Sequence, residues 1–193
     1  MTTRTGLRWA IVMLGVLIAV YVARRGDVSA APRIGFVDNG DGTITDTRTG
    51  LMWEKKTGTF GNPDYTDPTD VNNGYTWSYT VNAPDGTLFT DFLPRMNCSV
   101  SEWGTCPAGG KYRDWRIPTV RELQTTLVPG CLIGTDSCID PVLGVTGLGN
   151  DWSSTWSSDF PGEVYVMDAR DGLVGSLVGQ YYGHVRAVRG GIR

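Results

Sequence analysis

The chain has 193 residues, of which 19% are charged, and its formal net charge at pH 7 is −3. This length suits one globular domain, because a single hydrophobic core typically serves about 100 to 200 residues. The 26 glycines and seven tryptophans favour a turn-rich β protein over a bundle of long helices. The same composition argues against disorder.

The N-terminal segment has the composition of an export signal. Arg4 and Arg8 precede an apolar run from Trp9 to Ala23, and Val28–Ala30 supplies the small residues that a signal peptidase recognises. We therefore predict a signal peptide over residues 1–30. The alternative is an uncleaved N-terminal membrane anchor, because the run has 15 residues, long for a signal core and short of the roughly 20 that span a bilayer.

Removal of residues 1–30 would leave 13 basic and 19 acidic residues, a net charge of −6. We predict no nucleic-acid partner from this balance, because phosphate neutralisation needs a basic face. Contact with a membrane is expected only through the N-terminal segment, if that segment is not cleaved.

The four cysteines all follow the predicted export segment. Two disulfides are expected in an oxidising compartment. The local pairing Cys98–Cys106 and Cys131–Cys138 is favoured, because each pair brackets a short loop rich in turn residues, although other pairings remain open. A zinc site is the rival interpretation, but the spacing is not CxxC and the only histidine, His184, is remote in sequence.

The first half of the predicted domain is expected to form a β meander, followed by an insertion and a helix. Turn residues at Asn39–Gly42 and Thr47–Gly50 predict two hairpins between residues 35 and 55. Residues 57–87 are polar and aromatic and predict a long, surface-exposed insertion with a short strand at Tyr75–Val81. Apolar residues at helical spacing predict a short helix over Leu88–Asn97.

A second helix and a run of strands are predicted in the other half. Thr119 and Glu122 form a capping-box pattern, and Pro129-Gly130 would end the helix that follows it. The remaining strands are predicted at Trp152–Trp156, Glu163–Asp168, Gly172–Leu177 and Gly183–Arg189. We expect Trp152 and Trp156 to share a face and to belong to the core.

Four stretches in order resemble one bacterial family. These stretches are Asp38–Thr43 leading to Gly50–Trp53, Asp114–Thr119 with Glu122-Leu123, Trp152–Thr155, and Val185–Gly191. Together they resemble the domain named for the C-terminal domain of a collagen-like adhesin. The resemblance implies an α+β, C-type lectin-like fold, with small antiparallel sheets and two short helices. It would form a single loop-rich domain over residues 31–193, with the insertion at about 57–87.

The acidic cluster Asp38, Asp41 and Asp46 offers oxygen ligands of the kind that calcium prefers. The spacing departs from a calcium loop, because Gly40 breaks the alternation of ligands. A β-turn stabilised by its Asp and Asn side chains accounts for the same residues. We therefore predict no metal and no cofactor, and keep calcium as the alternative.

Aromatic and polar residues between the matching stretches are the candidate ligand contacts, because flat apolar rings beside directional polar groups suit sugar and protein surfaces. Simple packing is the competing interpretation for each of them. The candidates are Trp77, Tyr79, Asp159, Tyr181, Tyr182 and His184, with Tyr65, Tyr75 and Phe160 beside them. Arg186 and Arg189 are interpreted as structural, pairing with carboxylates or strand carbonyls.

We therefore predict an exported binding or adhesion module of the periplasm, cell surface or extracellular space that recognises a glycan or a protein. The alternative is a structural subunit of an envelope or extracellular assembly, and an oligomer is compatible with either. A third hypothesis is an enzyme related to the formylglycine-generating oxidase. Catalysis is not predicted, because the chain has one histidine and no Gly-x-Ser-x-Gly elbow.

Overall fold

A computed structural model describes residues 35–99, 106, 110–131 and 137–191. The chain divides into two units, Met1–Ile34 and Gly35–Arg193, and the described residues all belong to the second. The predicted export segment, residues 1–30, lies outside the described residues and stays a prediction. Among the described residues, none of the helices has the length and apolar character needed to cross a membrane.

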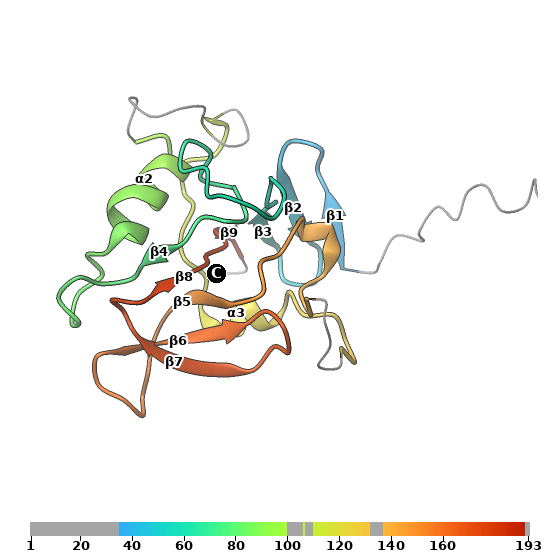
Figure 1. Cartoon of the computed structure of the whole chain (residues 1–193). Coiled ribbons are helices and arrows are strands. Elements are labelled where there is room, and N and C mark those ends of the chain that lie inside the picture. The colour runs from blue at the N-terminus through green and yellow to red at the C-terminus, as the bar shows by residue number, and fades with distance from the viewer. Residues whose placement is uncertain (1–34, 100–105, 107–109, 132–136, 192–193) are drawn as a thin grey trace, which may run out of the picture. The chain divides into compact units, whose positions relative to one another are not determined.

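The first hairpins form a four-stranded antiparallel sheet with the end of the chain. Its strands are β1 (Phe36–Asp38), β2 (Thr43–Asp46), β3 (Leu51–Glu54) and β9 (Val188–Gly190), in the order β1-β2-β3-β9 (Figure 1). Both predicted turns are confirmed. In the first turn, Gly40 and Gly42 have φ of 75° and 82°, a region that glycine enters without steric cost.

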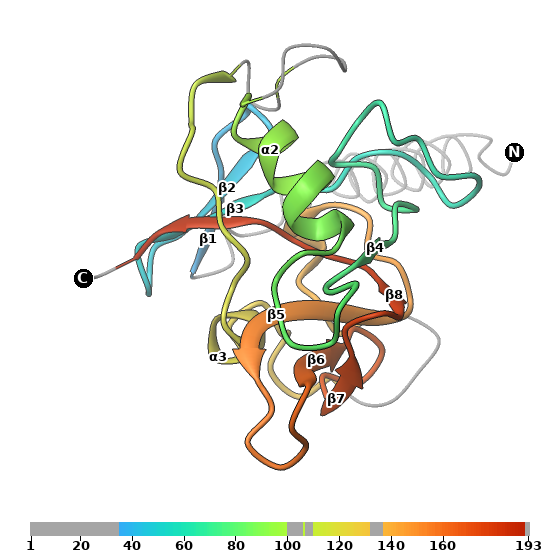
Figure 2. The same ribbon diagram turned by 90° about the vertical axis from the view of Figure 1, so that its left-hand side faces the viewer.

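Two smaller antiparallel sheets complete the β structure. Strands β5 (Asn150–Trp156), β6 (Glu163–Asp168) and β7 (Val174–Val178) form one, and β4 (Tyr75–Thr76) pairs with β8 (Tyr182–Gly183) in the other (Figures 1 and 2). The predicted strand Tyr75–Val81 is too long. It ends at Thr76 because the next two backbone N–H groups both donate to Gly179 O.

The helices are short. The predicted helix over Leu88–Asn97 is a π-helical turn, η1 (Leu88–Phe92), that continues into α2 (Leu93–Met96). Helix α3 (Val120–Gln124) follows Thr119, and a 3-10 turn, η3 (Pro141–Leu143), precedes β5. Together with the small antiparallel sheets and two disulfides, these elements confirm a mixed α+β fold.

Two apolar clusters form the core. The first joins the insertion and helix residues Tyr75, Trp77, Leu88, Phe92 and Met96 to Trp115, Ile117, Trp152, Val164, Val166, Val185 and Ala187. The second joins Phe36, Ile44, Leu51 and Trp53 of the four-stranded sheet to Leu123, Ile139, Leu143, Met167, Ala169 and Val188. Each cluster thus packs residues from both halves of the chain.

The insertion is only partly exposed, so its predicted position on the surface is wrong for residues 68–71 and 75–78. Residues 57–66 are exposed, whereas residues 68–71 and 75–78 are buried. Two indole N–H groups bind the buried residues 75–78 to β5 across the core. Trp152 Nε1 donates to Tyr75 O at 2.8 Å, and Trp77 Nε1 donates to Ser153 O at 2.9 Å.

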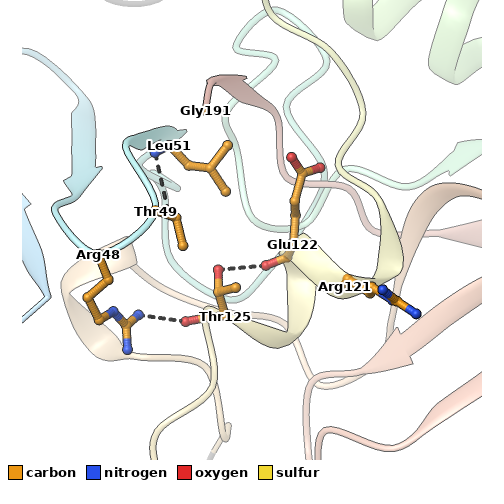
Figure 3. Close-up of a pocket in the computed structure, with 7 residues that line it drawn as sticks. All are labelled: Arg48, Thr49, Leu51, Arg121, Glu122, Thr125 and Gly191. Atoms are coloured by element: carbon orange, nitrogen blue, oxygen red, sulfur yellow. Dashed lines mark hydrogen bonds between the residues drawn. The ribbon is translucent and has the colours of Figure 1, made fainter. Parts of the chain in front are cut away.

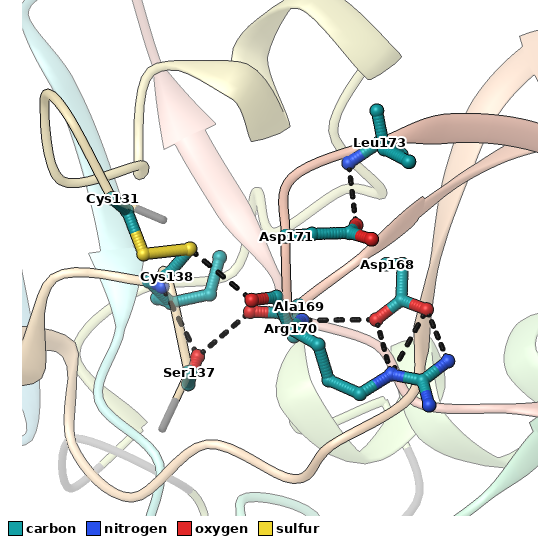
Figure 4. The surroundings of a disulfide bond; sticks show 9 residues. Cys131, Ser137, Cys138, Asp168, Ala169, Arg170, Asp171 and Leu173 are labelled. Carbon is teal, nitrogen blue, oxygen red and sulfur yellow. Dashed lines mark hydrogen bonds and ion pairs between the residues drawn. A yellow bond between two sulfur atoms is a disulfide. The ribbon is translucent and has the colours of Figure 1, made fainter. Parts of the chain in front are cut away.

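Two disulfides join Cys98 to Cys106 and Cys131 to Cys138, the local pairing that the spacing favours. The second lies beside the turn between β6 and β7 (Figure 4). There Cys138 N donates to Ala169 O at 2.7 Å, and Ser137 Oγ donates to the same oxygen at 3.1 Å. These bonds connect Ser137 and Cys138, at one end of the disulfide, to the β6–β7 turn.

The predicted capping box at the start of α3 is present. Thr119 Oγ1 accepts a hydrogen bond from Glu122 N at 3.2 Å, and Glu122 Oε2 accepts one from Thr119 N at 2.7 Å. Arg116 holds the Glu122 carboxylate with two further hydrogen bonds.

Replacement of Thr119 by alanine should lower the free energy of unfolding by about 1 kcal/mol, because it removes the side-chain acceptor of the box. Urea or thermal unfolding measures this loss. The control Thr119→Ser keeps the hydroxyl and should remain close to the wild type. Equal losses in both variants would show that the hydroxyl is not the stabilising group.

Candidate functional site

A small cavity lies where β4 and β8 meet the start of β5. Its volume is about 270 Å³. The residues that line it are Gly74, Gly149, Asn150, Tyr182, Gly183 and His184. Two of the predicted ligand contacts, Tyr182 and His184, therefore meet at one hollow.

Backbone pairing on both sides holds the cavity in place. In the β4–β8 pair, Tyr75 lies opposite Gly183 and Thr76 opposite Tyr182. On the other side, His184 N donates to Asn150 O and Trp152 N donates to His184 O, each at 2.9 Å. The segment carrying Tyr182 and His184 is thus fixed between β4 and β5.

Glycines leave room for the histidine ring. A Cβ atom at Gly147 would lie 3.0 Å from His184 Nε2, and one at Gly149 would lie 3.1 Å from His184 Cδ2. Both distances are tighter than ordinary contacts, so side chains here would press on the imidazole. The wall of the cavity is consequently made largely of backbone.

The aromatic side of the cavity is open to solvent. Tyr182 is 72% exposed, and its ring lies next to Gly74, where an added Cβ would be 3.6 Å from Tyr182 Cδ1. Asn150 contributes an amide that can both donate and accept hydrogen bonds. The arrangement offers a flat ring, an amide, an imidazole and backbone polar groups, and none of the lining side chains carries a fixed charge.

Behind this cavity, charged side chains are buried. Asp151 is buried and forms a parallel β-bridge with His184. Arg186, two residues after His184 in the sequence, is also buried. Burial raises the pKa of the Asp151 carboxyl, while the charges of Arg186, His184 and Lys56 act in the opposite direction. Burial likewise raises the pKa of Glu54, against the effect of Lys56.

Arg186 is held by the backbone as well as by charge. Its Nη1 donates to Leu143 O at 2.6 Å, and its Nη2 donates to Thr146 Oγ1 at 3.2 Å. The structural role predicted for Arg186 is thus supported. Arg189 also pairs with a carboxylate, with Nε donating to Asp114 Oδ1 at 2.6 Å.

The other predicted contacts lie outside the cavity lining. Tyr79 and Tyr181 are both exposed, and Gln180 Nε2 donates to Tyr79 O at 2.9 Å, which links their two loops. Asp159 is exposed in the β5–β6 hairpin, where its Oδ2 accepts from Tyr165 OH at 3.3 Å. The structure therefore brings Tyr182 and His184 together and leaves Asp159 in a hairpin of its own.

Two of the aromatic candidates are core residues, which corrects the sequence-based expectation. Trp77 is only 2% exposed and packs edge-on against Phe89 and Trp156. Tyr75 is buried as well. Trp156 departs from expectation in the opposite direction, because a register shift between Trp152 and Trp156 leaves Trp156 at the surface.

The sequence predicted Tyr182 and His184 as ligand contacts but not the other residues that line the cavity. Asn150 and the glycines at 74, 149 and 183 carry no motif of their own. The run Gly147-Leu148-Gly149-Asn150 was the available signal, since closely spaced glycines mark a place where backbone approaches another group.

The acidic turn residues are occupied by partners within the protein. Asp38 pairs with Lys55, which lowers the pKa of its carboxyl together with the Gly40 N–H. Asp41 accepts from Thr43 Oγ1 and pairs with Lys111. In the part of the chain that the structure describes, no group of three or more acidic, histidine or cysteine side chains is placed to hold a metal ion.

Asp46 is bound in a similar way. Its buried carboxylate accepts two hydrogen bonds from the Arg48 side chain. Burial pushes the pKa of Asp46 upward, but the hydrogen bonds from Arg48 outweigh this effect and bring the pKa below its ordinary value.

A second cavity of about 410 Å³ lies between the β2–β3 turn and α3. Its polar groups are largely used internally. Arg48 Nη2 donates to Thr125 O at 2.9 Å, and Thr125 Oγ1 donates to Glu122 O, while Arg121 points away from the others (Figure 3). These bonds connect the β2–β3 turn to α3, so the polar groups of this cavity serve the fold. The Tyr182–His184 cavity is therefore the better candidate site.

Comparison with protein families identifies the domain. Residues 42–189 match the family model of the Lcl C-terminal domain. A search of the curated proteins finds no match to the chain.

Replacement of Trp77 by alanine should destabilise the fold by about 3 to 5 kcal/mol, because it empties a core position and removes the bond to Ser153 O. Tyr79→Ala, two residues later and exposed, should change stability by about 0.5 kcal/mol or less. Chemical denaturation of both variants checks this contrast. A Trp77 variant with native stability would contradict the burial described above.

Proposed function

Because the chain belongs to the Lcl C-terminal domain family, we propose that it is an exported binding module of the cell envelope or cell surface. Its ligand is a glycan, bound through a sugar residue at the cavity between Tyr182 and His184. The family match supports an adhesin-like role, since the family is named for the C-terminal domain of an adhesin. The choice of a glycan as the ligand rests on the size and lining of the cavity.

The size and lining of the cavity support a sugar. A volume of about 270 Å³ suits one ring better than an extended peptide. Its lower-polarity wall is the exposed ring of Tyr182, on which the C–H face of a sugar can stack. The Asn150 amide, the His184 imidazole and the glycine backbone supply directional hydrogen bonds for hydroxyl groups. The absence of fixed charge in the described lining favours a neutral sugar over an acidic one.

The proposed fold is C-type lectin-like. Support comes from the return of β9 to pair with β3, which places the end of the domain in the same sheet as its beginning. Short helices and small sheets between these two strands fit the same architecture. The sheet that carries the cavity, β4–β8, is then one of the small sheets inserted between the terminal strands.

The proposed location is the periplasm, cell surface or extracellular space. Two disulfides support it, because such bonds persist in oxidising compartments. The apolar N-terminal run from Trp9 to Ala23 supports it independently. We further propose that the module acts by binding rather than by catalysis, with the His184 imidazole holding the ligand.

Removal of the Tyr182 ring should abolish most ligand capture. We expect Tyr182→Ala to weaken binding by about 2 kcal/mol, roughly thirtyfold, without lowering the melting temperature by more than a few degrees. A glycan array on the exported protein identifies the ligand, and calorimetry with that glycan then measures the affinity.

The matched control is Phe160→Ala, which removes another exposed aromatic ring that does not line the cavity. It should leave the affinity unchanged, as should EDTA. Equal losses in both variants, or loss of binding in EDTA, would contradict a metal-independent site at Tyr182. A protein that captures no glycan but adheres to a protein surface would contradict the choice of ligand.

A further inference from the structure

Tyr65 lies against the wall of the Tyr182–His184 cavity, although it is not part of the lining. Its hydroxyl donates a solvent-exposed hydrogen bond to Gly74 O at 3.3 Å. Gly74 lines the cavity, and a Cβ atom added there would lie 3.6 Å from Tyr182 Cδ1. Tyr65 and Tyr182 therefore approach the same glycine, which adds no side chain between them.

The ring of Tyr65 has a face that a ligand can reach. It packs edge-to-face with the buried ring of Tyr75, with 5.9 Å between the centroids and 88° between the planes. A contact of this kind covers at most one face of either ring. Tyr65 accordingly remains 43% exposed. An apolar face is thus available beside the cavity, in addition to the ring of Tyr182.

The backbone around Tyr65 is held in place by two elements. Arg95 of α2 donates from Nη1 to Tyr65 O. The buried Asn73 donates from Nδ2 to Asp64 O at 3.0 Å, and its own carbonyl oxygen lies 3.3 Å from His184 Nδ1. The segment that carries Tyr65 is therefore tied to the residue that contacts the imidazole of the cavity. A ring ordered in advance loses little conformational entropy when a ligand binds it.

The charges around Tyr65 favour the same class of ligand as the cavity. Residues 57–74 include three aspartates and no lysine, arginine or histidine. Arg95, the cation that contacts Tyr65 O, also pairs with Asp91 at 2.6 Å. An acidic sugar would be repelled by these carboxylates, whereas a neutral sugar would not.

We propose that Tyr65 forms a second sugar subsite beside the cavity, so that the domain recognises at least two linked neutral sugars. This inference rests on the proposed function, because it takes the sugar at Tyr182 as its starting point. The cavity of about 270 Å³ holds the first sugar, and the next one stacks on Tyr65 across Gly74. Continuity of the two rings at Gly74 favours an extension of one ligand over a separate partner.

The test compares disaccharides with their constituent sugars. NMR titration of the exported protein uses cellobiose, maltose, lactose and chitobiose, each beside its own monosaccharides. At least one disaccharide should bind the wild type about tenfold or more tightly than its monosaccharides. Tyr65→Ala should reduce this advantage about tenfold, because it removes the ring on which the second sugar stacks. Tyr182→Ala should weaken the binding of the disaccharide and of the single sugar together.

Three further variants separate stacking from folding. Tyr65→Phe keeps the ring and should retain most of the disaccharide advantage. Tyr65→Leu keeps an apolar contact for Tyr75 without a flat ring, so it should lose the advantage as Tyr65→Ala does while preserving the melting temperature. The matched control is Phe60→Ala, which removes a 68% exposed ring of the same insertion that does not line the cavity. It should change neither affinity.

The outcomes distinguish this inference from the proposed function. If Tyr182→Ala weakens binding but Tyr65→Ala and Tyr65→Leu keep the full disaccharide advantage, the second subsite is wrong and the sugar site stands. Equal losses in Phe60→Ala and Tyr65→Ala would also overturn the subsite, as would a wild type that binds no disaccharide more tightly than its monosaccharides. Sugar binding that Tyr182→Ala leaves unchanged would contradict the proposed function itself, and the second subsite would fall with it.

Discussion

The structure depends on a set of opposite charges buried where its sheets meet. Arg186 and Lys56 lie beneath the surface with Glu54 and Asp151, and Lys56 Nζ is 2.5 Å from Glu54 Oε1. Glu54 comes from β3 and Asp151 from β5, so the group joins two sheets to the segment between β8 and β9. Loss of one partner from such a group leaves an uncompensated charge in the interior, which is why the partners must assemble together.

The candidate binding site is a consequence of the same arrangement. Asp151 precedes Trp152 in β5, and Arg186 lies two residues after His184 in the segment between β8 and β9. The backbone bonds between His184 and β5 therefore place the imidazole next to the buried charges. The lining of the proposed site consists of uncharged groups, including the Tyr182 ring, the Asn150 amide and glycine backbone. In an acidic chain, such an uncharged lining fits the neutral sugar that we propose as its ligand.

Local chemistry in the sequence predicted the local structure well. The glycine-rich turns, the Thr119 capping box and the two local disulfides each depend on residues close in sequence, and each is present in the structure. Tertiary packing was harder to foresee. Trp77 lies in a polar stretch that predicts exposure, yet it is buried against Phe89 of η1 and Trp156 of β5. The exposure of Trp156 follows from a bulge in β5 that alternation along a strand does not reveal.

The hydrogen bonds of the Trp77 and Trp152 indoles connect one part of the insertion to β5. The insertion therefore has two parts that differ in how well they should tolerate added residues. Residues 57–66 are exposed, so a peptide tag or a fluorophore placed there would meet solvent rather than core. Residues 75–78 are part of the core. Tyr75 O accepts a hydrogen bond from the Trp152 indole, and the Trp77 indole donates one to Ser153 O. The segment can therefore be lengthened near its beginning but cannot be replaced as a whole, and loop grafts between relatives should be joined before residue 67.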